Sequence, residues 1–340
     1  MKCFYARATE AHDPVFRLTH GKILRNAEQA ERARLLLAGL DQLSLGTEEP
    51  PEADRAALEA VHTPALLDFL ETAWDDWQKL PNPGPEVVPN VFPRASCSTY
   101  PTSVVGKAGW HMGDTSAPIG PHSWEATCRA ADCAIAAADA VIAGDRAAYA
   151  LCRPAGHHTT ADIAAGHCLM NNSALAAARL RTAFDKVATL DIDVHHGNGT
   201  QGIFYDRNDV LSVSIHADPV DYYPFFVGYA SETGEGAGEG YNLNIPLPRT
   251  TTDDAWIAAI ETGLARIAEF RPGALMLSLG LDAHESDPLK GMAVSWDGFR
   301  RAGALIAAAG YPTVIVQEGG YLSEDLTTSL VSFMTGYLGR

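Results

Sequence analysis

The chain has 340 residues, 46% of them hydrophobic, and a formal net charge of -17. This length and composition favour one large buried core, and no tandem pattern indicates a repeat array. The acidic balance excludes nucleic acid as the main partner, because a phosphate backbone is bound by clustered lysine and arginine. The same charge would attract a cationic substrate, although on charge alone solubility is the simpler explanation.

The cysteines and the N-terminal stretch indicate the compartment. None of the six cysteines belongs to a CxxC pair; they are Cys3, Cys97, Cys128, Cys133, Cys152 and Cys168. Neither a disulfide framework nor a thiolate zinc site is therefore indicated. The opening MKCFYARATEAHDP lacks the apolar segment of a signal peptide, and no uncharged apolar stretch is long enough to span a bilayer. We expect a cytoplasmic protein with no membrane partner.

Short β-rich runs alternate with alanine-rich amphipathic stretches along the chain. The expected strands are 147–152, 186–193, 209–216, 273–280 and 311–320, and the expected helices are 124–144, 171–184, 252–270 and 297–310. This alternation predicts an α/β fold, a single-domain open parallel β-sheet flanked by helices on both faces. Ligands of such sheets bind beyond the carboxyl ends of the strands, so we expect the active site there.

The segment 81–123 is rich in Pro, Gly and Ser and shows no periodicity. A loop of that length inside a compact domain is usually functional or disordered. Because neither end has the composition of a flexible linker, we interpret it as a long insertion within one domain that spans 1–340.

The stretch LDIDVHHGNG spaces Asp191, Asp193 and His195 at a period of two. Side chains at this period share one face of a strand, so the three can converge as the strand ends. Asp-x-His offers one oxygen and one nitrogen ligand, and catalytic zinc typically takes three protein ligands and leaves a fourth position open. The third ligand should come from another strand end, where LSLGLDAHESDP offers Asp282 and, as an alternative, His284.

Two further strand ends carry polar groups. CRPAGHHTT contains His157 and His158, and QEGGY places Tyr321 after two glycines. A lone Asp-x-His or Gly-Gly-Tyr is more often a turn than a site. A set of four imidazoles and three carboxylates at strand ends is not explained by turns. Burying so many polar groups is costly unless they bind one another or a metal.

RPAGHH, DIDVHHGNGTQ, GLDAHESDP and EGGY follow one another over residues 153–321. With these motifs the chain resembles the zinc-dependent deacetylases of the arginase/deacetylase fold, which include histone deacetylases and bacterial acetylpolyamine amidohydrolases. Weaker similarity at 61–77 and 124–126 extends the resemblance over nearly the whole chain.

The resemblance implies a metal site and its ligands. It places the ligands on Asp193, His195 and Asp282, and thereby selects Asp282 over His284. The implied cofactor is Zn²⁺, with Fe²⁺ as an alternative for the same ligands. A structural monovalent cation near Asp191 and Ser214 is also implied.

The resemblance also implies the catalytic residues His157, His158 and Tyr321, with Asp191 and Asn198 as partners of the two histidines. Two carboxylate ligands make Zn²⁺ a weaker Lewis acid than three imidazoles would, so the site needs help from nearby bases. A carboxylate partner favours imidazolium more than a neutral amide does. We therefore expect His158 to be the general base, His157 the more cationic partner, and the Tyr321 hydroxyl an oxyanion donor.

The insertion at 81–123 and the stretch GKILRN suggest the acetylpolyamine amidohydrolases in particular. In that subfamily the insertion narrows the substrate tunnel, contributes to a homodimer and offers acids to the ammonium groups of the substrate. The residues predicted to bind substrate are Asp114, Gly166, His167 and Tyr223. The chain departs from the subfamily near Val105, where a second acid is expected, and at His167, where an aromatic residue is usual.

The leading function is hydrolysis of the acetyl amide of acetylated polyamines or related small cationic acetylated amines. The alternative is an acetyl-lysine protein deacetylase, which would catalyse the same amide hydrolysis on a protein substrate. A narrow tunnel with an acidic rim argues against it. A non-catalytic binding relative would not need intact ligands, both histidines and the tyrosine. A two-manganese hydrolase of the arginase type is disfavoured, because the sequence offers one set of ligands.

Overall fold

The computed structural model describes residues 1–94 and 99–340, so Cys97 and part of the segment 81–123 lie outside the described residues. The strands are β1 Lys2–Phe4, β2 Arg17–Thr19, β3 Lys22–Leu24, β4 Thr47–Glu48, β5 Ala147–Ala150, β6 Val187–Asp191, β7 Val210–Ala217, β8 Asn242–Leu247, β9 Ala274–Leu279 and β10 Thr313–Gln317. Eight of them form one parallel sheet in the order β4-β1-β5-β10-β9-β6-β7-β8, and β2 and β3 form an antiparallel hairpin. The predicted α/β architecture is confirmed.

The five predicted strands are β5, β6, β7, β9 and β10, and every residue in them is buried. Strands covered on both faces are nearly continuous apolar runs, which is why the sequence revealed them. Strands β1, β4 and β8 were not predicted. β4 and β8 lie at the sheet edges with exposed or half-buried residues, and β1 is only three residues long.

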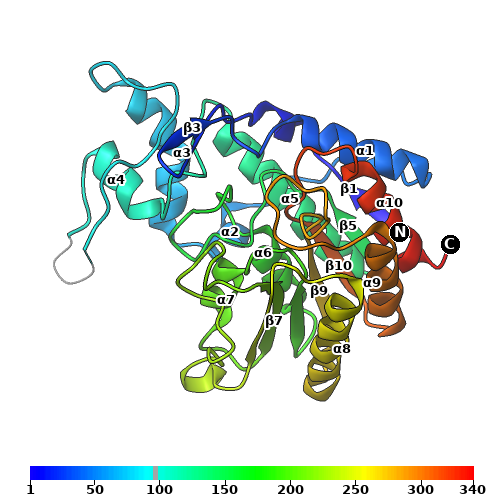
Figure 1. The fold of residues 1–340 in the computed structure, drawn as a ribbon. Helices are drawn as coiled ribbons and strands as arrows, with labels where there is room; N and C mark the ends of the chain where they lie inside the picture. Colours follow the sequence, from blue (N-terminus) through cyan, green and yellow to red (C-terminus); the bar gives the residue numbers. More distant parts are fainter. Residues whose placement is uncertain (95–98) are drawn as a thin grey trace.

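Helices cover both faces of the sheet (Figure 1). They are α1 Glu31–Gln42, α2 Arg55–Glu59, α3 Pro64–Gln78, α4 Val104–His111, α5 Ser123–Ile142, α6 Asn172–Leu180, α7 Asn198–Phe204, α8 Asp253–Phe270, α9 Trp296–Ala308 and α10 Leu326–Leu338, with short 3₁₀ turns at Arg7–Ala11 and Gly236–Gly238. None of the helices within the described ranges has both the length and the apolarity needed to cross a bilayer.

Alternate residues of each strand enter two separate cores. Ala148 and Ala150 pack with α3, α5 and α6, whereas Tyr149 and Leu151 pack with α1, α8, α9 and α10. This is the period of two expected of a strand buried on both sides. Alanines along α5 let that helix pack closely on β1, β5 and β10. The sheet is therefore fixed from both faces, and its carboxyl edge is a rigid platform.

The segment 81–123 differs from the expectation of an aperiodic loop, because it contains α4. The side chain of Ser103 caps this helix by accepting a hydrogen bond from the backbone N–H of Val105 at 3.3 Å. Gly109 lies against the backbone of Val91, where a Cβ atom would stand 1.9 Å from the carbonyl oxygen. Figure 1 shows α4 on an arm that extends away from the sheet. A helix of eight residues between prolines and glycines has too little periodicity to be recognised from sequence.

Candidate active site

Four neighbouring strands, β5, β10, β9 and β6, end at one edge of the sheet. His157 and His158 follow β5, Asp193 and His195 follow β6, Asp282 follows β9 and Tyr321 follows β10. The parallel arrangement thus brings together residues that are up to 164 positions apart in the sequence, as between His157 and Tyr321. This edge is the one at which open α/β sheets bind ligands.

The side chains of Asp193, His195 and Asp282 form a buried group whose ligand atoms all lie within 4.8 Å of one another. Nδ1 of His195 lies 3.0 Å from Oδ1 of Asp193 and 3.1 Å from Oδ2 of Asp282. Strand β6 ends at Asp191, two residues earlier than predicted, so Asp193 and His195 stand on the loop that follows it. Backbone hydrogen bonds order that loop, from Asp193 N–H to Asp191 Oδ1 and from Val194 N–H to Asp282 Oδ1.

This donor set fits a divalent cation. Burial and the neighbouring charge of Asp193 raise the pKa of Asp282, because two carboxylates repel each other without a cation between them. Glycines make room around them: a Cβ on Gly319 would lie 2.2 Å from Oδ2 of Asp282, and the Gly319 N–H donates to Asp193 Oδ2 at 2.7 Å. One nitrogen and two oxygen ligands, all buried, can together hold such an ion.

The two tandem histidines have different partners. Nδ1 of His157 lies 2.8 Å from Oδ2 of Asp191, and Nδ1 of His158 lies 2.6 Å from Oδ1 of Asn198. Burial opposes protonation of His157, but the charges of Asp191 and Asp193 outweigh it and raise its pKa well above the ordinary value. Burial and the charge of His157 hold the pKa of His158 well below it. These surroundings favour the protonated form of His157 and the neutral form of His158.

Tyr321 is 4% exposed and is held by contacts on two sides. Its backbone N–H donates to Oδ2 of Asp287 at 2.9 Å, and the guanidinium of Arg32 lies over its ring, 4.9 Å from the centroid. Burial raises the pKa of the phenol well above its usual range, so the hydroxyl keeps its proton. Within the described residues this hydroxyl has no hydrogen-bond partner, which leaves it available as a donor.

A cavity of about 470 Å³ leads to this group. Its lining includes His195 and Tyr321, and also three of the predicted substrate-binding residues, Gly166, His167 and Tyr223. The Tyr223 ring meets the His158 ring edge-on, with centroids 4.9 Å apart. The predicted base therefore borders the aromatic wall of the cavity.

Gly166 and His167 form a turn in which both residues have positive φ, at 57° and 70°. A Cβ on Gly166 would stand 2.3 Å from Cδ2 of His158, so only glycine fits against that ring. Nδ1 of His167 lies 2.8 Å from the carbonyl oxygen of Ser116. Burial and the nearby charge of Arg17 lower the pKa of His167 to about 3, so this wall is polar but neutral.

Asp114 lies directly behind the wall of the cavity, hydrogen-bonded to two of the residues that line it. Among the described residues it is not one of those that line the cavity, and its carboxylate accepts hydrogen bonds from the protein itself. Oδ2 accepts from the Tyr223 hydroxyl at 2.6 Å and from the Gly166 N–H at 3.0 Å, while Oδ1 accepts from the Ser116 N–H at 2.7 Å. This side chain fixes the walls of the cavity, and a contact with the substrate stays a prediction.

Sequence reasoning missed four residues of the site. Tyr222 stacks on His195 with centroids 5.0 Å apart, Asp287 holds the Tyr321 backbone, and Arg17 and Arg249 line the cavity. Tyr222 and Asp287 adjoin motifs that the sequence displayed. Nothing in the sequence distinguishes the two arginines from other surface arginines.

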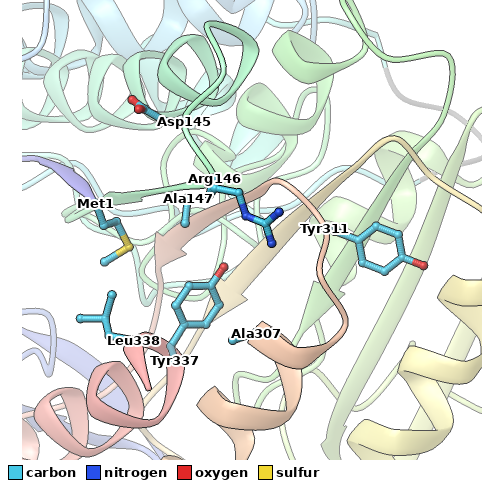
Figure 2. Close-up of a pocket in the computed structure, with 8 residues that line it drawn as sticks. All are labelled: Met1, Asp145, Arg146, Ala147, Ala307, Tyr311, Tyr337 and Leu338. Atoms are coloured by element: carbon cyan, nitrogen blue, oxygen red, sulfur yellow. The ribbon is translucent and has the colours of Figure 1, made fainter. Parts of the chain in front are cut away.

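A second cavity, of about 380 Å³, lies at the opposite, amino-terminal edge of the sheet, beside Met1, Ala147 and Tyr311 (Figure 2). Figure 2 shows the side chains of Arg146 and Tyr337 next to each other there. Among the described residues, those around this second cavity include no group that could hold a metal ion. The chemistry is therefore assigned to the carboxyl edge.

Comparison with known proteins agrees with this geometry. The profile of the histone deacetylase domain matches residues 26–337. The chain is 43% identical over 327 residues to an acetylpolyamine amidohydrolase of Burkholderia pseudomallei, covering 96% of this chain and 95% of the relative. It is 37% identical over 344 residues to an acetylpolyamine amidohydrolase of Mycoplana ramosa, covering all of both chains. The crystal structure of an acetylpolyamine aminohydrolase from Burkholderia pseudomallei superimposes with a TM-score of 0.96 at 42% identity, over 99% of this chain and 98% of the other.

Proposed function

The chain belongs to the histone deacetylase family, and on this premise we propose that it hydrolyses the acetyl amide of small acetylated amines, acetylpolyamines first among them. The products are acetate and the free amine. The observation that carries the proposal is that Tyr321 and the metal-ligand candidate His195 line one cavity, whose wall at Tyr223 lies against the ring of His158. The names of the long, closely similar relatives supply the substrate class.

Asp193, His195 and Asp282 would hold the metal ion, which we propose to be Zn²⁺, with Fe²⁺ as the alternative for the same ligands. When bound, the ion supplies Lewis acidity that polarises the amide carbonyl. A monovalent cation near Asp191 and Ser214 also remains a proposal. Its support is that these two residues are register partners where β6 lies beside β7.

The two histidines and the tyrosine would carry the proton transfers. His158 is neutral, and because its Nδ1–H donates to Asn198, its Nε2 is free to accept a proton from water. The oxygen of that water forms a bond to the carbonyl carbon, and the Tyr321 hydroxyl donates to the oxygen that becomes negative. The cationic His157 stabilises the same charge. A histidine then protonates the amine nitrogen, the C–N bond breaks and acetate leaves.

Two further properties stay predictions. A homodimer formed through the segment 81–123 agrees with the arm that carries α4, which extends from the body (Figure 1). A cytoplasmic location rests on the sequence alone. Gel filtration with light scattering and cell fractionation are the corresponding measurements.

The acetyl-lysine protein deacetylase is the second function to test, since the family profile does not separate the two. Purified protein loaded with zinc should be offered N-acetylputrescine, N-acetylspermidine and an acetyl-lysine peptide, and acetate release measured. Faster turnover of the small amines supports the proposal. Preference for the peptide would assign the protein deacetylase function, and absence of acetate from all three would refute both.

A further inference from the structure

Glu318 is a buried acid that lies between two parts of the catalytic group. It follows strand β10 directly and stands three residues before Tyr321. Its side chain is 0% exposed, and among the described residues it is not one of those that line the cavity. Burying a carboxylate is costly unless hydrogen bonds satisfy its oxygens. The partners of Glu318 therefore indicate what this acid does.

One oxygen of Glu318 holds the backbone that carries the tandem histidines. Oε2 accepts from the N–H of Gly156 at 2.6 Å and from the N–H of His157 at 3.1 Å. The carbonyl oxygen of His157 accepts in turn from the N–H of Gly199 at 2.9 Å. The turn at His157 and His158 is thus fixed between Glu318 on one side and helix α7 on the other.

The other oxygen and the backbone of Glu318 fix the acid itself. Oε1 accepts from the hydroxyl of Ser173 on α6 at 2.6 Å, and that hydroxyl lies 2.9 Å from the hydroxyl of Ser278 on β9. The N–H of Glu318 donates to the carbonyl of Leu279 at 2.9 Å, and its carbonyl accepts from the guanidinium of Arg32 at 2.7 Å. Because all of these residues are buried, Glu318 has a fixed place at the ends of β9 and β10.

These contacts join the two strand ends on which the proposed proton transfers depend. Strand β5, which precedes the histidines, and strand β10, which precedes Tyr321, are neighbours in the sheet. The Nδ1 contacts of His157 and His158 set the rotation of each ring, but the position of each ring also depends on its backbone. A misplacement of about 1 Å can lower the rate of a positioned reaction about 10²-fold. A fixed distance between the turn and Tyr321 therefore matters for the chemistry.

We propose that Glu318 is a positioning residue, which holds the turn of His157 and His158 at the place, relative to Tyr321, that amide hydrolysis requires. The inference rests on the proposed deacetylase function and adds to it a residue that acts through the histidines. The part of Glu318 that acts is the oxygen shared by two backbone N–H groups. Because the side chain does not line the cavity, kcat should depend on it and KM should not.

The test compares Glu318→Ala with Glu318→Gln in the zinc-loaded protein, with N-acetylputrescine as the substrate. Glu318→Ala leaves both N–H groups without an acceptor, so kcat should fall about 10²-fold with little change in KM. In Glu318→Gln the amide oxygen can accept from both N–H groups, and the NH₂ group can donate to Ser173, whose hydroxyl can turn to Ser278. This variant should keep kcat within about tenfold of the wild type.

Asp132→Ala is the matched control. Asp132 on α5 is 4% exposed, its Oδ1 accepts from the N–H of Ala53 at 2.8 Å, and it is not among the described residues that line the cavity. The variant also takes a buried carboxylate from a backbone donor, so the free energy of unfolding should fall while kcat stays near that of the wild type. An equal loss of kcat in Asp132→Ala and Glu318→Ala overturns the inference, and so does a change confined to KM or a Glu318→Gln variant as slow as Glu318→Ala.

Ser173→Ala is the variant to use if Glu318→Ala does not fold. It removes the hydroxyl that orients the carboxylate and keeps the carboxylate itself. Its kcat should fall by roughly 3- to 10-fold at constant KM. An unchanged kcat in this variant would count against the positioning role.

Proton NMR gives a measurement that does not depend on activity. The Nδ1–H protons of His157 and His158, hydrogen-bonded to Asp191 and Asn198, should give resonances at low field. These resonances should shift in Glu318→Ala and stay in Glu318→Gln, and unchanged resonances in Glu318→Ala would overturn the inference. If the wild type cleaves no acetyl amide, the proposed function fails, and the resonances still decide whether Glu318 places the turn.

Discussion

The carboxylate of Asp114 accepts a hydrogen bond from the Tyr223 hydroxyl at 2.6 Å, across 109 positions of sequence. The same oxygen also accepts from the backbone of Gly166, which lies against the ring of His158. One acid on the arm of the segment 81–123 thus orients two walls of the cavity. This arrangement changes what its substitution should do.

Asp114→Asn should lower kcat/KM for charged and neutral acetyl amides alike, by roughly 5- to 30-fold, because an amide has one acceptor oxygen for three donors. From the sequence alone a selective loss for cationic substrates is expected, since Asp114 is there an acid that meets the ammonium group. Kinetics on the cationic N-acetylputrescine and the neutral N-butylacetamide distinguish the general loss of activity from the selective one. Tyr223→Phe, which removes one of the donors, is the companion variant, and a loss confined to the cationic amide would restore the simpler expectation.

One catalytic metal ion should bind per chain. Chelation should abolish acetate release and Zn²⁺ should restore it, since a neutral His158 has little driving force against an unpolarised amide. Asp282→Asn should lower the metal content, because it removes one of two carboxylate ligands. Metal analysis of the purified protein measures both, and two tightly bound catalytic ions per chain would exclude the assignment.

Tyr321→Phe should lower kcat by about 10²–10³ with little change in KM, as for the loss of a single oxyanion donor. The fold should be kept, because the contacts of Arg32 and Asp287 are to the ring and the backbone. Steady-state kinetics test this, with circular dichroism as the check on folding. Near-normal turnover would mean that the tyrosine only packs.

Asn198→Asp should move the acid limb of the kcat/KM profile to higher pH by roughly 1–3 units. The new carboxylate would stabilise the imidazolium of His158 and raise its pKa, so the base is lost to protonation earlier as the pH falls. Asp191→Asn is the contrasting variant, because it removes the carboxylate from His157. An acid limb that moves in Asp191→Asn and stays in Asn198→Asp would reverse the roles of the two histidines.

His62 should make stability depend on pH at a place outside the catalytic group. Its Nε2 accepts from the Asn171 N–H at 2.9 Å, its Nδ1 donates to the Thr160 carbonyl at 3.1 Å, and burial lowers its pKa to about 4. The unfolded chain protonates this imidazole near pH 6.5, so stability is complete above that pH and falls as the pH drops toward 4. Between pH 7 and pH 5 the loss from this residue should be about 2 kcal/mol.

His62→Gln keeps a donor and an acceptor but does not titrate, so its free energy of unfolding should fall less over the same interval. Urea denaturation at the two pH values measures the difference between wild type and variant. Equal declines in both proteins would show that other buried histidines account for the pH dependence.

The core of the fold could be predicted from the sequence because strands buried on both faces are continuous apolar runs, as in β7 and β9. Strand β4 and helix α4 could not, since a strand of two residues or a helix of eight between prolines has no measurable period. The candidate ligands were visible for a different reason. Polar groups placed directly after apolar strands have few structural purposes, so Asp193, His195 and the tandem histidines stood out.

The sequence by itself determined which chemical groups the site contains: three carboxylates, four imidazoles and a phenol at strand ends. Only the tertiary structure decided what each group faces, because side-chain contacts between distant segments leave no local pattern. It placed the carboxylate of Asp114 on the Tyr223 hydroxyl, and it brought Arg17 from a short hairpin to the lining of the cavity. Which charged side chains line the cavity is a property of that packing, and neither motif nor net charge encodes it.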